Sequence, residues 1–276
     1  MKSVKQSFDL KDKIAIITGG AGFLGEKHAE AIAEFGGIPI LLDVNKKVGT
    51  EKANRISDKY QVDCEYIDCD ITQESQILEV KEVLLNNNKS VEILINNAAI
   101  DPKVKSINKK NLSRLENFKI EQWNIEISVG LTSSMLCSKI FGHEMAKKNR
   151  GVILNISSDL GIIAPDQRLY KQERVLESEQ PVKPVTYSVI KHGLIGLTKY
   201  LATYWADKGV RCNALCPGGI YDNQPDDFVT KISNLIPLGR MAHPDEYKAA
   251  VVFLVSEASS YMNGGILSID GGRSAW

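Results

Sequence analysis

The stretch KIAIITGGAGFLG, residues 13–25, decides the fold. It opens with an apolar run typical of a strand, and the residues after it, 25–36, carry the apolar spacing of a helix. A second apolar run, IPILLD, occupies residues 38–43. A strand, a helix and another strand in this order form a βαβ unit, in which the two strands are parallel.

The turn between the first strand and the helix has the spacing G-x-G-x-x-G, at Gly20, Gly22 and Gly25. Glycine allows positive φ and close approach of a pyrophosphate, and the helix N-terminus offers unpaired N–H groups. Asp43, at the end of the next strand, would accept both ribose hydroxyls of NAD and repel the phosphate of NADP. We therefore predict a site for NAD, while Lys46 keeps NADP as the second choice and a tight turn without ligand is the structural alternative.

The same alternation continues along the chain. Apolar strands separated by helices must be covered on both faces, so we predict a Rossmann-type, doubly wound α/β fold with a mostly seven-stranded parallel sheet. We expect residues 1–276 to form a single domain for cofactor binding and catalysis, with insertions near 100–119 and 162–184. The further strands are expected at 63–68, from Val91, and at 151–157, 210–216 and 265–270, and the helices near 45–60, near 72–86, before Gly151 and from near Thr186.

Composition excludes several classes of function. The charges of the 34 basic and 34 acidic residues cancel, which argues against electrostatic binding to nucleic acid or to an anionic membrane. The five cysteines are odd in number and lack C-x-x-C spacing, and the four histidines lack metal-ligand spacing, so we expect no disulfide framework and no metal. With neither a signal peptide nor a membrane-spanning run, a cytoplasmic protein that acts on a small molecule is expected.

The segment TYSVIKHG places Tyr187 and Lys191 four residues apart on one face of a helix. A free phenol has a pKa near ~10, and a neighbouring ammonium favours the phenolate and brings the group toward its working range. Upstream, NISSDLG ends a strand at Ser157 and Ser158, where a hydroxyl could bond a substrate oxygen. Either serine could instead be a turn residue.

Together with CDIT, NNAA, GVRCNALCPGGI and IDGG, these segments make the chain resemble the short-chain dehydrogenase/reductase family over roughly residues 11–272. The resemblance implies that Ser158 binds the substrate oxygen, that Tyr187 is the general acid/base, and that Lys191 holds the nicotinamide ribose. It also implies a homodimer or homotetramer formed through the Tyr187 helix and the helix before it. The cofactor contacts that it implies are Gly19, Gly22, Phe23, Leu24, Gly25, Asp43, Asp70 (at the adenine), Ile71, Asn96, Asn97, Ala98, Ala99, Tyr187, Lys191, Pro217, Gly218, Gly219 and Ile220.

Two positions depart from the family pattern. The glycines read T-G-x-x-G-x-x-G, the spacing of the epimerase and dehydratase branch, but the sequence stops at Trp276 without the further substrate domain of that branch. We therefore expect a single-domain dehydrogenase. The family's fourth catalytic residue, an asparagine, falls on Gly130, so its role is expected to be absent, to pass to Ser128 or Thr132, or to be filled by backbone and water.

The long stretch between Ser158 and Tyr187 is expected to overhang the active site, because a catalytic residue anchors each end. It contains several polar and charged residues, which are Asp166, Gln167, Arg168, Tyr170, Lys171, Arg174 and Lys183. Guanidinium groups suit phosphate or carboxylate recognition, which favours a sugar, sugar phosphate or nucleotide sugar as substrate. A solvated flap or a subunit contact is the alternative.

The leading hypothesis is an NAD-dependent oxidoreductase that moves a hydride between nicotinamide and a secondary alcohol or ketone. The overall pattern is also similar to dehydrogenases of bacterial surface-carbohydrate or flagellin-modification pathways. Two alternatives remain, an NAD-retaining sugar epimerase or dehydratase and a non-catalytic NAD-binding subunit.

Overall fold

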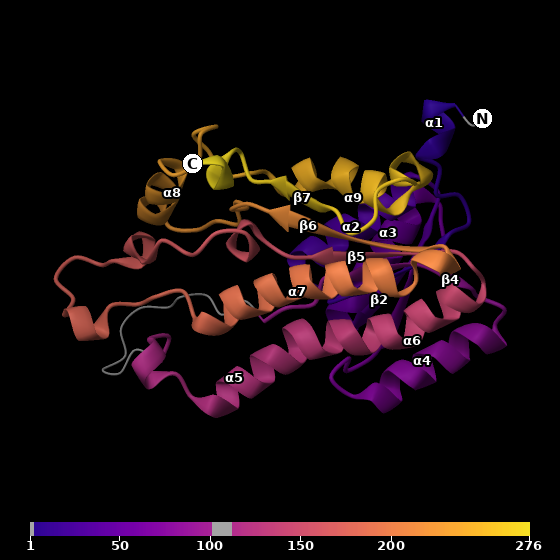
Figure 1. The fold of residues 1–276 in the computed structure, drawn as a ribbon, viewed down its shortest axis with the longest axis horizontal. Coiled ribbons are helices and arrows are strands. Elements are labelled where there is room, and N and C mark those ends of the chain that lie inside the picture. Colours follow the sequence, from indigo (N-terminus) through magenta and orange to yellow (C-terminus); the bar gives the residue numbers. More distant parts are fainter. Residues whose placement is uncertain (1–2, 101–111) are drawn as a thin grey trace.

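The computed structural model describes residues 3–100 and 112–276. Within them, seven strands form one parallel sheet in the order β3-β2-β1-β4-β5-β6-β7 (Figure 1). The predicted Rossmann-type sheet is confirmed, and every strand begins within two residues of its expected start. The strands are β1 (Ile14–Thr18), β2 (Ile38–Asp43), β3 (Glu65–Asp68), β4 (Val91–Asn96), β5 (Gly151–Ile156), β6 (Val210–Pro217) and β7 (Ile266–Ile269).

Side chains alternate between the two faces of the sheet along each strand, so both faces carry apolar residues. Helices therefore cover both faces. In β1, Ala15 and Ile17 belong to one hydrophobic core, and Ile14 and Ile16 belong to the other. The first core is covered by α2 (Phe23–Glu34), α3 (Lys46–Tyr60) and α9 (Lys248–Val255), and the second by α4 (Glu74–Asn86), α6 (Ser133–Lys147) and α7 (Val185–Tyr204) (Figure 1). The remaining α-helices of the described chain are α1 (Val4–Ser7), α5 (Ile120–Ile127) and α8 (Asp226–Ser233).

The winding direction reverses between β1 and β4, and this places a crevice at their carboxyl ends. Thr18 and Asn97 join the two loops that leave these strands. The Thr18 hydroxyl accepts hydrogen bonds from the backbone N–H groups of Asn97 (3.0 Å) and Ala98 (3.1 Å). The Asn97 side-chain amide donates to the carbonyls of Thr18 (3.0 Å) and Gly19 (3.2 Å). The glycine turn is therefore fixed to the loop after β4.

A π-helical turn, Ser128–Thr132, joins α5 to α6 and brings this segment close to α7. Gly130 is buried in the turn, and a Cβ built on it would lie 2.8 Å from Ile190 Cγ2. Since that is closer than carbon atoms can pack, the absence of a side chain at Gly130 allows α7 to lie where it does.

The two insertions contact each other at the carboxyl edge of the sheet. Arg114 donates to the carbonyl of Glu177 (2.6 Å), and the N–H of Val182 donates to the Ser113 hydroxyl (3.1 Å). The second insertion also packs on α8, where the rings of Tyr170 and Phe228 are 5.8 Å apart. Residues 101–111 of the first insertion lie outside the described residues.

Two further observations bear on the class of protein. All five cysteines are free and buried. No helix in the described ranges is long and apolar enough to cross a bilayer.

Candidate active site

A cavity of about 1150 Å³ opens at the carboxyl edge of the sheet, and most of the predicted site residues line it. Gly25 and Asn96 do not. A Cβ on Gly25 would lie 2.2 Å from the Gly19 carbonyl oxygen, so Gly25 serves the close packing of α2. Asn96 is buried, and its side-chain amide donates a hydrogen bond to the side-chain oxygen of Asn155 (2.8 Å). The predicted residues in the lining are Gly19, Gly22, Phe23, Leu24, Asp43, Asp70, Ile71, Asn97, Ala98, Ala99, Ser158, Tyr187, Lys191, Pro217, Gly218, Gly219 and Ile220.

The glycine turn fits a pyrophosphate. Gly19 has φ +63°, a conformation that favours glycine, and its Cα is pressed against Ala98, whose Cα would be 2.9 Å from an added Cβ. Gly22 caps α2 without any side-chain hydrogen bond, so the N–H groups of the first helical turn have no side-chain partner from the cap. These groups and the positive end of the helix dipole would hold the phosphates of a dinucleotide.

Asp43 ends β2 beside this turn. Its carboxylate accepts hydrogen bonds from the backbone N–H groups of Ala21 (3.0 Å) and Asn45 (3.0 Å). The carboxylate is therefore fixed where it lines the cavity. None of the cations in the described lining, Lys171, Lys183, Lys191 and Arg273, belongs to the segment that follows β2.

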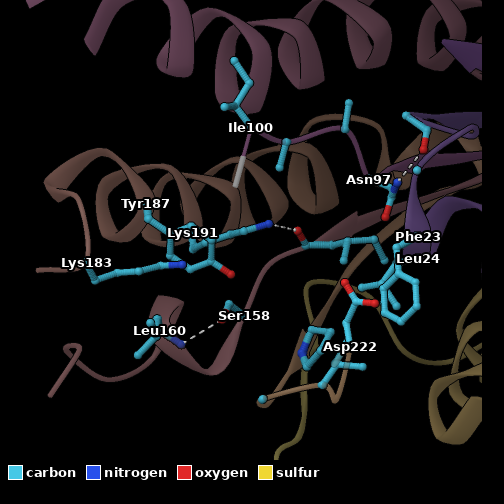
Figure 2. Close-up of a pocket in the computed structure, with 18 of the residues that line it drawn as sticks. Phe23, Leu24, Asn97, Ile100, Ser158, Leu160, Lys183, Tyr187, Lys191 and Asp222 are labelled. Atoms are coloured by element: carbon cyan, nitrogen blue, oxygen red, sulfur yellow. Dashed lines mark hydrogen bonds between the residues drawn. The ribbon is translucent and has the colours of Figure 1, made fainter. Parts of the chain in front are cut away.

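Tyr187 and Lys191 lie one turn apart on α7, and both line the cavity. The Lys191 side chain is buried, and its ammonium donates to the carbonyl of Ile156 (2.9 Å) at the end of β5 (Figure 2). The same ammonium lies 5.7 Å from the centre of the Tyr187 ring. A buried positive charge at this distance favours the phenolate form of the tyrosine.

The two serines after β5 have different partners. Ser157 donates its hydroxyl to the Lys191 carbonyl (2.7 Å), which ties the loop to α7. Ser158 donates to the Asp159 carboxylate (2.8 Å) and accepts from the N–H of Leu160 (3.1 Å). Ser157 therefore has a tethering contact, whereas the Ser158 hydroxyl must turn away from Asp159 to donate to a bound substrate.

Of two further lining cations, Arg273 was not predicted from the sequence, and Lys183 was predicted only as one of the polar residues of the second insertion. Arg273 pairs with Asp159 (3.0 Å), and both side chains are buried. Lys183 lies at the end of the second insertion, with its ammonium 3.8 Å from the centre of the Tyr187 ring (Figure 2). In the sequence, Asp159 is next to Ser158, Arg273 directly follows IDGG, and Lys183 is four residues before Tyr187.

Arg168, whose guanidinium group made it one candidate substrate contact in the second insertion, does not line the cavity. Its side chain is 82% exposed and pairs with Asp166 (2.6 Å). Of the two residues expected to replace the family asparagine, Ser128 lines the cavity and Thr132 does not. Across residues 3–100 and 112–276, no three His, Cys, Asp or Glu side chains form a group that could hold a metal ion.

A doubly wound sheet with a glycine turn at its switch point, and a tyrosine and lysine in the adjoining cavity, defines a nicotinamide-dependent oxidoreductase. A family model described as enoyl-(acyl carrier protein) reductase matches residues 20–274, and the chain belongs to the short-chain dehydrogenase/reductase family. Members of this family bind a nicotinamide cofactor and interconvert alcohols and ketones, and the chain is an oxidoreductase of this kind.

Three relatives illustrate the similarity. An NADP-dependent mannitol dehydrogenase of Alternaria alternata is 30% identical over 276 residues, covering 98% of this chain and 95% of the relative. A 2-dehydro-3-deoxy-D-gluconate 5-dehydrogenase of Bacillus subtilis is 30% identical, with coverages of 99% and 98%. The solved structure of a short-chain dehydrogenase from Leptospira borgpetersenii with bound NAD+ is 33% identical, with a TM-score of 0.82 and coverages of 99% and 96%.

Proposed function

We propose that this protein is an NAD-dependent dehydrogenase of a polyhydroxylated small molecule, and that one domain binds both cofactor and substrate. The observation that carries the proposal is the convergence of Tyr187, Lys191 and Ser158 in one cavity with the glycine turn. The relatives support the substrate class, because mannitol and 2-dehydro-3-deoxy-D-gluconate both carry several hydroxyl groups.

The proposed mechanism assigns one task to each side chain. Tyr187 takes the hydroxyl proton of the alcohol during oxidation and returns it during reduction. Lys191, held by the carbonyl of Ile156, stabilises the phenolate. Ser158 turns from Asp159 and donates to the substrate oxygen as negative charge develops there. A nicotinamide cofactor held by the glycine turn and Lys191 would supply the hydride acceptor, to which the substrate C–H bond would give its hydrogen with the electron pair.

Asp43 supports NAD as the cofactor. Its carboxylate lines the end of the cavity where a ribose would follow the glycine turn. The residues directly after it are Val44 and Asn45, so no guanidinium follows β2 to receive the extra phosphate of NADP. We therefore expect a higher kcat/KM with NAD than with NADP.

The first prediction concerns Tyr187. Replacing it with Phe removes the proton-transfer group, and kcat for alcohol oxidation is expected to fall by about 10²–10⁴-fold, as measured by nicotinamide absorbance with a panel of polyols and sugar acids. Tyr200→Phe is the matched control, because Tyr200 is on the same helix, 61% exposed and outside the cavity.

Unchanged turnover in Tyr187→Phe would contradict the proposed role of the phenol. Conversion of a sugar without net formation of reduced cofactor would favour an epimerase or dehydratase. Stabilisation by NAD without turnover of any alcohol would favour a binding subunit.

A further inference from the structure

We propose that Asp159 and Arg273 form a binding site for a second hydroxyl group of the substrate. In this site the Arg273 guanidinium donates a hydrogen bond to the hydroxyl oxygen, and the Asp159 carboxylate accepts one from the same hydroxyl. The inference rests on the proposed function and deepens it, because it names the residues that select a polyol over a simple alcohol. The proposed mechanism uses Ser158 and Tyr187 for the reacting hydroxyl and gives this pair no contact with the substrate.

The pair lies directly beside the serine that binds the reacting oxygen. Asp159 follows Ser158 in the chain, and both Asp159 and Arg273 line the cavity. One oxygen of the Asp159 carboxylate accepts from the Ser158 hydroxyl (2.8 Å), and the other accepts from Nη1 of Arg273 (3.0 Å). A substrate oxygen bonded to Ser158 is therefore within about two hydrogen-bond lengths of this carboxylate, so a neighbouring hydroxyl of the substrate can reach the pair.

The Arg273 guanidinium has donors that the protein does not use. A guanidinium group carries N–H donors on all three of its nitrogens. Within residues 3–100 and 112–276, the Arg273 side chain donates only through Nη1, to Asp159. Its Nε and Nη2 atoms have no hydrogen-bond partner in these ranges, and neither atom is fully buried. Since the residue lines the cavity and only 6% of its surface is exposed, these donors are accessible to a ligand in the cavity.

The turn that carries Arg273 is held in place by Asp270. The Asp270 carboxylate accepts hydrogen bonds from the N–H groups of Gly272 (2.9 Å) and Ser274 (2.9 Å), and its carbonyl accepts from the N–H of Arg273 (3.2 Å). Gly272 has φ +90°, a conformation that favours glycine. This order before binding favours affinity, because little conformational entropy is lost at Arg273 when the substrate binds.

The chemistry of the pair matches an uncharged hydroxyl group. A hydroxyl both donates and accepts hydrogen bonds, whereas a guanidinium only donates and a carboxylate only accepts. Arg273 and Asp159 can therefore bind one hydroxyl together. A carboxylate on the substrate would have no hydrogen to donate, and it would place a second negative charge beside Asp159, which already balances the charge of Arg273. An alkyl group would leave the donors of Arg273 without a partner.

The test compares four-carbon alcohols on the full-length protein with NAD. D-threitol and 2-butanol share the chain length and a secondary alcohol but differ in their further hydroxyl groups, and D-threonate represents the acids. A hydrogen bond to a charged group corresponds to about tenfold or more in kcat/KM. For the wild type, kcat/KM is therefore expected to be at least about tenfold higher for D-threitol than for 2-butanol.

Arg273→Lys keeps a positive charge for Asp159 but removes the Nε and Nη2 donors. It is expected to reduce the kcat/KM ratio of D-threitol over 2-butanol at least about tenfold, mainly through a higher KM for D-threitol. Arg150→Lys is the matched control, because Arg150 also pairs with a carboxylate, that of Glu92 (2.8 Å), but is outside the cavity lining. This control is expected to leave the ratio unchanged. If Arg273→Lys does not fold, the double variant Arg273→Met with Asp159→Asn, which has no buried charge, is expected to lower the ratio in the same way.

Three results would overturn the inference. These are equal use of D-threitol and 2-butanol by the wild type, a preference of the wild type for D-threonate over D-threitol, and a wild-type ratio in Arg273→Lys or, if that variant does not fold, in the double variant. The last result is the one that a merely structural role of Arg273 gives, because such a role lowers kcat/KM for both alcohols by the same factor.

Failure of the proposed function is distinguishable from these results. In each of the three the protein still oxidises an alcohol, so the proposed function stands, whereas its failure means that no compound of the panel is oxidised. In that case, greater thermal stabilisation by D-threitol than by 2-butanol in the presence of NADH, lost in Arg273→Lys, would still report the hydroxyl site. Equal stabilisation by the two alcohols would overturn it.

Discussion

At the scale of single residues, Gly130 occupies the position at which the family has an asparagine, and it has a packing role there. Ile190 follows Tyr187 by three positions on α7, and its methyl group fills the space that a side chain at Gly130 would need. The π-helical turn and α7 are therefore in closer contact than an asparagine at position 130 allows. Ser128 lines the cavity from the same turn, and we propose that it takes over the role of the family asparagine in the water relay.

Restoring the family asparagine with Gly130→Asn is expected to destabilise the protein by about 1–3 kcal/mol without raising kcat, because Ile190 or α7 must shift to admit the side chain. Urea unfolding and steady-state kinetics measure the two effects. Gly196→Asn on α7 is the control, since a Cβ there has no atom within 4 Å. A gain in kcat with no loss of stability would show that the site can accept the asparagine after all.

At the scale of elements, one buried ion pair joins the loop after β5 to the turn after β7. The side chains of Arg273 and Asp159 are 6% and 4% exposed, and Arg273 contacts Oδ2 of the Asp159 carboxylate. Oδ1 of the same carboxylate accepts hydrogen bonds from the Ser158 hydroxyl (2.8 Å) and from the N–H of Leu160. The position of the Ser158 hydroxyl thus depends on Asp159, whose partner Arg273 is 114 positions further along the chain.

Arg273→Met leaves the Asp159 carboxylate buried without its partner, and the loss of stability in urea is expected to be about 3–5 kcal/mol. The double variant Arg273→Met with Asp159→Asn should lose less unfolding free energy than Arg273→Met and Asp159→Asn lose together as single variants, since the double variant leaves no buried charge. Arg150→Met is the control, because its pair with Glu92 is 62% exposed on the arginine side and is expected to contribute at most about 1 kcal/mol. Additive losses would show that the two charges do not interact.

At the scale of the whole molecule, the pH dependence of stability reflects a histidine inside α2. Burial lowers the pKa of His28 from 6.5 to about 4. The unfolded chain therefore binds a proton in a range where the folded protein does not, and the stability contributed by neutral His28 is present above pH 6.5 and is lost as the pH falls toward 4.

Between pH 7 and 5, this group is expected to account for about 2 kcal/mol of lost unfolding free energy. In urea unfolding, His28→Leu should lose correspondingly less unfolding free energy between pH 7 and 5. His243→Gln, at an exposed position, should show the same pH dependence of stability as the wild type. Parallel pH profiles for wild type and His28→Leu would mean that another group causes the loss.

Much of the molecule could be predicted from local sequence. The strands, the glycine turn and the spacing of Tyr187 and Lys191 are short-range patterns, because each depends on residues a few positions apart. The contacts that Lys183 and Arg273 make could not be predicted in this way. Lys183 reaches Tyr187 through the geometry of the turn at Pro184, and Arg273 meets Asp159 only in the assembled sheet. Arg168 had suitable chemistry, but its exposure depends on tertiary structure.

The central position of β1 governs the order in which the protein can assemble during synthesis. β1 pairs with β2 and β4, so the glycine turn gains both neighbouring strands only after Asn96 has left the ribosome. The Ser158 loop is completed later still, because its ion pair needs Arg273. The two strands that flank the glycine turn are therefore synthesised long before Arg273, whose ion pair fixes the loop that carries Ser158.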